Sequence, residues 1–169
     1  IFGASQIILN GNMNGYDNRV ALTAFGSGYT PLWNYTFTDN VYDIEEALFE
    51  NPLTLSNETN YSTGLLDSID LINSRDDKTR TPAVIFLSDG VPNTDYGIEE
   101  AKILRDMGVK VYPIAIYTNP NKYLSNISHD QKTVYNASDT EAFERIMLEV
   151  LEESVQESTT LSFQLEDIL

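Results

Sequence analysis

The chain has 169 residues, of which 41% are hydrophobic and 21% charged, a composition typical of one folded domain and unlike that of disordered or fibrous chains. Its 26 acidic and 10 basic residues give a formal net charge of -16, so we expect no nucleic acid partner, because such a field repels phosphate backbones. No apolar run approaches the ~20 residues that a membrane span needs, so we expect no direct membrane insertion. The absence of cysteine excludes disulfides, zinc–thiolate sites, iron–sulfur clusters and a cysteine nucleophile.

The opening residues carry a helical pattern. Ile1, Ala4 and Ile8 recur at helical spacing, and the sequence does not begin with methionine. We therefore expect the sequence to enter midway through a helix, with further sequence upstream.

Strand and helix patterns then alternate along the chain. Strands are predicted by apolar runs or by alternation of apolar and polar residues, and helices by apolar residues three and four apart. The predicted strands cover residues 19–25, 32–37 (an edge strand), 83–87, 109–116 and 133–135. The predicted helices cover residues 41–50, 62–72, 96–107 and 138–151, and a long polar loop is expected at 117–131.

Individual residues mark the boundaries of these elements. Ser62 is expected to cap the helix that follows it, and Ser138 begins a capping-box pattern with Glu141. Gly108 is placed to take a left-handed conformation after the preceding helix. Pro113 lacks a backbone donor inside its strand, which predicts a bulge or one-sided pairing there.

The alternation of strands and helices predicts an α/β fold, namely a Rossmann-like, doubly wound, mostly parallel sheet with helices on both faces. In such sheets ligands bind outside the carboxyl ends of the strands. We expect one domain over residues 1–155, and a strand or linker towards a neighbouring module over residues 156–169.

Two loops at that edge of the sheet carry oxygen ligands. Thr59 precedes a predicted helix, and Asp89 follows the apolar strand at 83–87. Hydroxyl and carboxylate oxygens suit a hard divalent cation, and magnesium accepts few protein ligands while leaving room for an outside anion. The alternative is that Thr59 serves a turn and that Asp89, before Gly90, is an Asx-turn residue.

The order and spacing of these motifs resemble the von Willebrand factor A (VWA) domain family. The resemblance rests on Phe86-Leu-Ser-Asp-Gly90 after a buried strand and on Glu58-Thr59-Asn60 before a helix, and it extends over roughly residues 1–155. It implies a metal-ion-dependent adhesion site (MIDAS) at the top of the sheet. In that site Thr59 and Asp89 would be metal ligands for Mg²⁺, Mn²⁺ or Ca²⁺, and the bound ion would engage an Asp or Glu of a protein partner.

One feature of the family is absent. No Asp-x-Ser-x-Ser loop, which supplies further ligands after the family's first strand, occurs in the 169 residues. We interpret residues 1–155 as a VWA-like domain that is N-terminally incomplete and lacks its first strand, which leaves the middle of the sheet open. The alternative is a degenerate copy that no longer binds metal.

The sequence predicts no catalytic site. It has no Asp-x-Asp pair of the phosphatase kind and no Gly-rich phosphate loop, and the order of Thr59 and Asp89 is not that of a receiver domain. The single histidine, His129, lies in a polar stretch that favours a solvated side chain. We therefore expect a binding module and not an enzyme.

Composition bears on the location. A sequence rich in Asn, Thr and Tyr and without cysteine is similar to A-type domains of Gram-positive surface and pilus-tip adhesins. This similarity implies an extracellular, cell-surface protein whose partner is a host matrix or cell-surface protein. The alternative is a cytoplasmic A-type scaffold of an ATPase or chelatase complex.

Overall fold

A computed structural model describes residues 2–10, 17–26, 33–51, 59–93, 95–116 and 122–166. None of the helices that these residues form is long and apolar enough to cross a membrane. In chain order the elements are α1 (Phe2–Asn10), β1 (Val20–Ala24), β2 (Trp33–Thr38), α2 (Val41–Glu50), α3 (Tyr61–Ser74), β3 (Ala83–Ser88), α4 (Ile98–Asp106), β4 (Lys110–Ile116), α5 (Lys122–Ile127), β5 (Tyr135–Ala137) and α6 (Thr140–Glu166).

The strands form two sheets. β3, β4 and β5 form a parallel sheet in the order β3-β4-β5, which confirms the α/β class and the parallel arrangement. β1 pairs with β2 in a separate antiparallel sheet. The strand predicted at 19–25 forms as β1, and no strand among the described residues bridges β1 and β3. This gap is consistent with the expectation that the middle of the sheet stays open where the first strand is absent.

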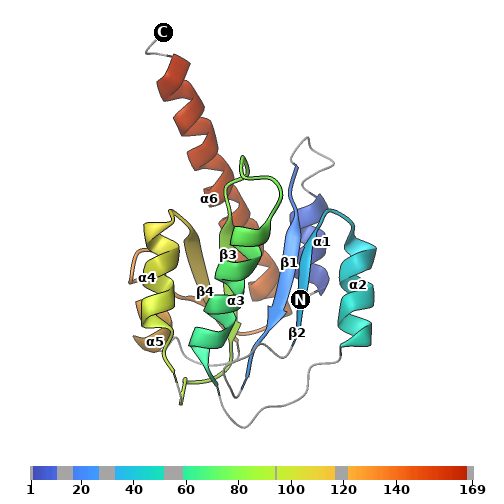
Figure 1. Cartoon of the computed structure of the whole chain (residues 1–169), viewed down its shortest axis with the longest axis vertical. Coiled ribbons are helices and arrows are strands. Elements are labelled where there is room, and N and C mark those ends of the chain that lie inside the picture. The colour runs from blue at the N-terminus through green and yellow to red at the C-terminus, as the bar shows by residue number, and fades with distance from the viewer. Residues whose placement is uncertain are drawn as a thin grey trace.

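Helices cover both faces of the parallel sheet, as predicted. Alternate side chains of a strand point to opposite faces, and β3 shows this clearly. Val84 and Phe86 pack in one core cluster with residues of α3 and α4, whereas Ile85 and Leu87 pack in another with residues of α6. Figure 1 shows α3 and α4 in front of the parallel strands and α6 behind them.

Pro113 lies where β4 is paired on one side. It is the register partner of Phe86 in β3, while pairing of β4 with β5 begins only at Ile114. The missing donor of proline therefore costs no ladder bond to β5, and the expected one-sided pairing is confirmed.

The caps of two helices differ from the prediction. Asn60 caps α3, because its side chain accepts a hydrogen bond from the Thr63 backbone N–H at 3.2 Å. Asp139 takes the same role for α6 by accepting from the Ala142 N–H at 2.8 Å. Ser62 and Ser138 are therefore not the caps. The cap must accept from a backbone N–H two or three residues ahead, which Asn60 and Asp139 do.

Two glycines with positive φ lie on either side of α4. Gly108 follows the helix with φ 74, which confirms its predicted left-handed conformation. Gly97 precedes the helix with φ 66, so α4 begins at Ile98 instead of Tyr96. A left-handed residue interrupts the helical dihedral angles that the earlier start requires.

The C-terminal third departs most from the prediction. The stretch expected as a loop at 117–131 contains α5, and the strand expected at 133–135 forms at 135–137. Of the strand or linker expected at the C-terminal end, the strand is wrong over residues 159–166, because α6 continues to Glu166. A linker role stays a prediction. No glycine or proline occurs between residues 140 and 166 to end that helix.

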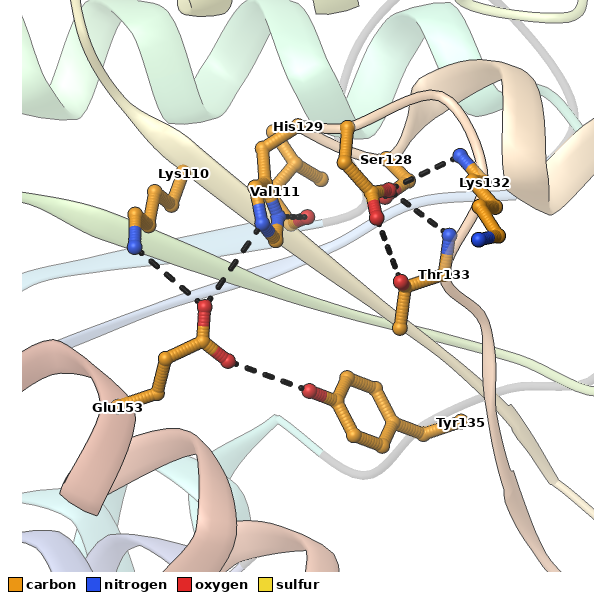
Figure 2. A network of polar contacts seen from close by, with 9 residues as sticks. Lys110, Val111, Ser128, His129, Lys132, Thr133, Tyr135 and Glu153 are labelled. Carbon is orange, nitrogen blue, oxygen red and sulfur yellow. Dashed lines mark hydrogen bonds and ion pairs between the residues drawn. The ribbon is translucent and has the colours of Figure 1, made fainter.

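His129 is a structural residue and not a solvated one. Its side chain is 21% exposed, and its Nδ1 lies 2.9 Å from the Val111 carbonyl oxygen. Glu153 of α6 lies against Lys110, His129 and Tyr135, with Nζ and Nε2 at 3.4 and 3.8 Å from its carboxylate (Figure 2). Burial, together with the charge of Glu153, raises the pKa of Tyr135 to about 12.

Asp130 organises the turn between α5 and β5. Its carboxylate accepts hydrogen bonds from the Ser128 and Thr133 hydroxyls at 2.6 Å and from the Lys132 and Thr133 N–H groups at 2.9 and 2.8 Å (Figure 2). Partial burial raises the pKa of Asp130, but the four hydrogen bonds outweigh it and hold that pKa well below its usual range.

This pKa shift predicts a pH dependence of stability. A carboxyl group whose folded pKa is depressed stabilises the fold above its unfolded pKa, near 3.9, and loses that contribution as the pH falls towards the folded value. Asp130→Asn should therefore lower the free energy of unfolding at pH 7, and the difference from wild type should shrink progressively below about pH 4.

Urea denaturation at pH 7, 4 and 3 measures this difference in the free energy of unfolding. Asp106→Asn, at an exposed position in α4, is the control, and a difference that stays constant with pH contradicts the prediction.

Candidate functional site

Thr59 and Asp89 lie together at one end of the parallel sheet. A Cβ atom placed on Gly90 would lie 3.3 Å from Thr59 Oγ1, so the Thr59 hydroxyl adjoins the turn that Asp89 begins. Asp89 is exposed and Thr59 is partly buried. Asp89 directly follows β3, so both residues occupy the carboxyl-end edge where α/β sheets bind ligands.

Hydrogen bonds from backbone N–H groups fix the two loops to each other. The Thr59 N–H donates to Asn93 Oδ1 at 2.9 Å, and the Asn93 N–H donates to the Thr59 carbonyl at 3.1 Å. One residue further on, Asn60 forms a parallel bridge with Asp95, whose carbonyl accepts from the Tyr61 N–H at 3.0 Å. These bonds hold the start of α3 beside the segment that follows β3.

A buried aromatic cluster forms the floor below these loops. Tyr61 is fully buried, and its ring centroid lies 5.0 Å from that of Phe86 in β3 and 6.3 Å from that of Phe25. Phe25 stacks on Phe86 at 4.8 Å. The Tyr61 hydroxyl donates to the Gly90 carbonyl at 2.7 Å. The cluster therefore joins the end of β1, the start of α3 and β3, and it fixes the Asp89–Gly90 turn.

Two glycines allow this close approach. A Cβ on Gly64 of α3 would lie 2.6 Å from Phe25 Cδ1, and a Cβ on Gly97 would lie 2.7 Å from Leu65 Cδ1. Real Cβ atoms do not approach other atoms so closely. Glycine at both positions thus lets α3 pack directly on Phe25 and on the segment before α4.

The oxygens of Thr59 and Asp89 suit a hard cation such as Mg²⁺, but two protein ligands are few for firm binding. The described residues contain no group of three or more His, Cys, Asp or Glu side chains that could hold a metal ion. Hydroxyl and carboxylate chemistry thus fits a metal in kind, with Thr59 and Asp89 as the two candidate side chains.

The residues that support this site were not predicted from the sequence. Tyr61 carries no motif of its own, and Asn93 and Asp95 act through their contacts with Thr59, Asn60 and Tyr61. The polar, turn-like composition of residues 92–95 is the one signal that could have indicated a loop there.

Comparisons with known proteins give a family match and a fold match. The family model of the von Willebrand factor type A domain matches residues 4–149. No curated protein matches the sequence. Solved structures that share the fold include proximal thread matrix protein 1 (PTMP1) from the mussel byssus, with 21% identity and a TM-score of 0.68 over 90% of this chain and 41% of that one. Another form of PTMP1 was solved with a zinc-occupied MIDAS motif.

Two pilus proteins share the fold at lower identity. The pilus adhesin SpaC from Lactobacillus rhamnosus GG, in its open conformation, has 14% identity and a TM-score of 0.72 over 92% of this chain and 27% of that one. The vWF domain of the type V pili tip protein Mfa5 from Porphyromonas gingivalis has 11% identity and a TM-score of 0.69 over 90% and 86%. This chain therefore spans about two fifths of PTMP1 and about a quarter of SpaC.

Proposed function

Because the chain belongs to the von Willebrand factor type A domain family, we propose that it is a protein-binding module that holds a divalent cation at Thr59 and Asp89. The cation is Mg²⁺, or Mn²⁺ or Ca²⁺ in its place, and it engages an Asp or Glu side chain of the partner. The observation that carries this proposal is the approach of the Thr59 hydroxyl to the Asp89–Gly90 turn, where it lies 3.3 Å from a Cβ placed on Gly90.

The chemistry of the cation supports recruitment of an anion. Mg²⁺ prefers octahedral oxygen coordination and usually keeps several waters beside its protein ligands. A carboxylate of the partner can replace one of these waters, and Asp89 is exposed at the position where the partner approaches. Domains of this family are usually non-catalytic, so we propose binding without turnover.

The second part of the proposal concerns the gap between the sheets. Among the described residues β1 pairs only with β2 and β3 only with β4, yet Phe25 stacks on Phe86 across the gap. A cavity of about 270 Å³ lies beside the starts of β1 and β3, lined by Arg19, Phe37 and Ala83 among others. We propose that a strand from outside the described residues pairs with both free edges and brings the further oxygen ligands.

We also propose an extracellular location in a larger cell-surface or pilus protein, with a host matrix or cell-surface protein as partner. The fold similarity to the pilus proteins SpaC and Mfa5 supports this location. Residues 156–169 then connect the domain to a neighbouring module, since α6 leads away from the body at the end opposite to the start of α3 (Figure 1).

The test compares residues 1–169 with a form extended upstream by the protein's own sequence. Mn²⁺ binding, followed by electron paramagnetic resonance, should be at least about tenfold tighter in the extended form, because added ligands complete the coordination. Adhesion of the extended form to immobilised matrix proteins should require Mg²⁺ and be abolished by EDTA. An extended form that binds no Mn²⁺, or adhesion that EDTA leaves unchanged, would show a metal-independent scaffold instead.

A further inference from the structure

The outer face of α2 carries the two most exposed large hydrophobic side chains of the described residues. Phe49 is 86% exposed and Tyr42 is 72% exposed. They are seven residues apart, which is close to two helical turns, so they lie on the same side of the helix about 10 Å apart along its axis. A stripe of aromatic residues in full contact with water is unusual for a face that has no partner.

Packing of the fold does not account for this stripe. The opposite side of α2 supplies the core, where Ile44 is fully buried and Ala47 is 3% exposed. Ile44 packs with Leu9 of α1 and with β1. Figure 1 shows α2 at the margin of the molecule, next to β2, with no element beyond it. Tyr42 and Phe49 therefore point away from the described elements that α2 packs against.

Acidic side chains surround the two aromatic residues. Within α2, Asp43, Glu45, Glu46 and Glu50 are acidic, and the helix contains no lysine or arginine. Asp43 is engaged locally, since its carboxylate accepts from the Thr38 hydroxyl at 2.6 Å and from Asn40 Nδ2 at 2.7 Å. The three glutamates are exposed, and none of the ion pairs between described residues involves them.

The combination of charge and aromatic surface selects the kind of partner. A second copy of this chain carries the same acidic face and the same net charge of -16, so two such faces repel each other. Anionic lipid is repelled for the same reason. A segment with lysine or arginine next to apolar side chains meets both features, because cations pair with the glutamates and stack on aromatic rings.

We propose that the outer face of α2 is a second protein-binding surface, which takes a cationic, amphipathic segment of a partner protein. Tyr42 and Phe49 anchor the apolar side chains of that segment. Glu45, Glu46 and Glu50 attract its basic residues. This surface does not depend on a metal ion at Thr59 and Asp89, and its partner segment carries the opposite charge to the acidic group proposed for that site.

The test uses a synthetic amphipathic peptide of leucine and lysine as the probe, titrated into the 169-residue chain by calorimetry in EDTA. Tyr42→Ser/Phe49→Ser should weaken binding about tenfold or more, as expected for aromatic anchors at an interface. The matched control is Ile103→Ser/Met107→Ser, which removes two exposed apolar side chains, 45% and 39% exposed, from α4. It should change the affinity less than about twofold.

The charges have a separate readout. Glu45→Gln/Glu46→Gln should weaken binding at low salt and flatten its salt dependence, because exposed charges are screened at high ionic strength. Unchanged thermal midpoints confirm that the variants fold, since all six substituted side chains are exposed. Equal loss of affinity in the α2 and α4 variants overturns the proposal, because it means non-specific attraction to an acidic protein. Two further results overturn the proposal. One is that the wild-type chain is a dimer and that Tyr42→Ser/Phe49→Ser makes it monomeric. The other is that this variant binds the peptide as tightly as the wild type does.

Discussion

Tyr61→Ala should cost about 3–5 kcal/mol of unfolding free energy, the range for removing a large buried aromatic side chain. Tyr61 is fully buried, and its ring contacts Phe86 and Phe25 at centroid distances of 5.0 and 6.3 Å. Its loss opens a cavity where the end of β1, α3 and β3 meet. A domain is stable by only about 5–15 kcal/mol, so much of the stability of the fold depends on this ring.

Tyr61→Phe is the matched control, because it keeps the ring and removes only the hydroxyl that donates to the Gly90 carbonyl at 2.7 Å. It should cost about 1 kcal/mol, the usual contribution of one hydrogen bond. Urea denaturation followed by circular dichroism measures both variants. If Tyr61→Ala costs no more than Tyr61→Phe, the aromatic cluster is not the support of the loops that the structure indicates.

Local patterns predicted most of the elements. The apolar run at 83–87 became β3 at Ala83–Ser88, and the helix predicted at 41–50 matches α2 (Val41–Glu50). These elements follow from periodicity and from residues such as Gly108, which ends a helix and acts within a few positions along the chain. Their outcome therefore depends little on the rest of the fold.

Contacts between distant segments were not predictable in the same way. The antiparallel pairing of β1 with β2 depends on which strand edges meet, and the pattern of a short strand is the same in either orientation. The continuation of α6 past residue 159 is a second case. Its apolar residues Leu161, Phe163 and Leu165 alternate, but helix propagation without a breaker prevailed over that short alternation.

The candidate site shows the same division. Thr59 was predicted from its hydroxyl and its place before a helix, and Asp89 from its carboxylate and its place after a strand. The structure brings the Thr59 hydroxyl to the Asp89–Gly90 turn. Their role as metal ligands stays a prediction. Tyr61 and Asn93, which hold the loops in place, were missed because hydrogen bonds between segments some 30 residues apart leave no periodic signal.

Asp89→Ala is expected to abolish metal-dependent adhesion of the upstream-extended form while leaving its fold intact. Asp89 is the only carboxylate proposed among the cation's ligands in this chain. Changes to groups that merely support a ligand typically weaken metal affinity 10–100-fold, so loss of the ligand itself should weaken adhesion by at least about 100-fold. Thr59→Ala removes a neutral oxygen and should weaken adhesion less than Asp89→Ala does.

The side chain of Asp89 is exposed, and substitutions at exposed positions usually change stability by less than about 0.5 kcal/mol. Equal thermal midpoints in EDTA should therefore accompany the loss of adhesion. Asp106→Ala is the charge-matched control. Asp106 is exposed at the end of α4, and its substitution removes the same charge from the acidic surface. Adhesion measured at increasing Mg²⁺ separates the two effects. Loss of a metal ligand raises the Mg²⁺ concentration that adhesion requires, whereas loss of a surface charge affects both aspartate variants equally. Equal adhesion of the Asp89→Ala and Asp106→Ala variants would exclude Asp89 from the metal site.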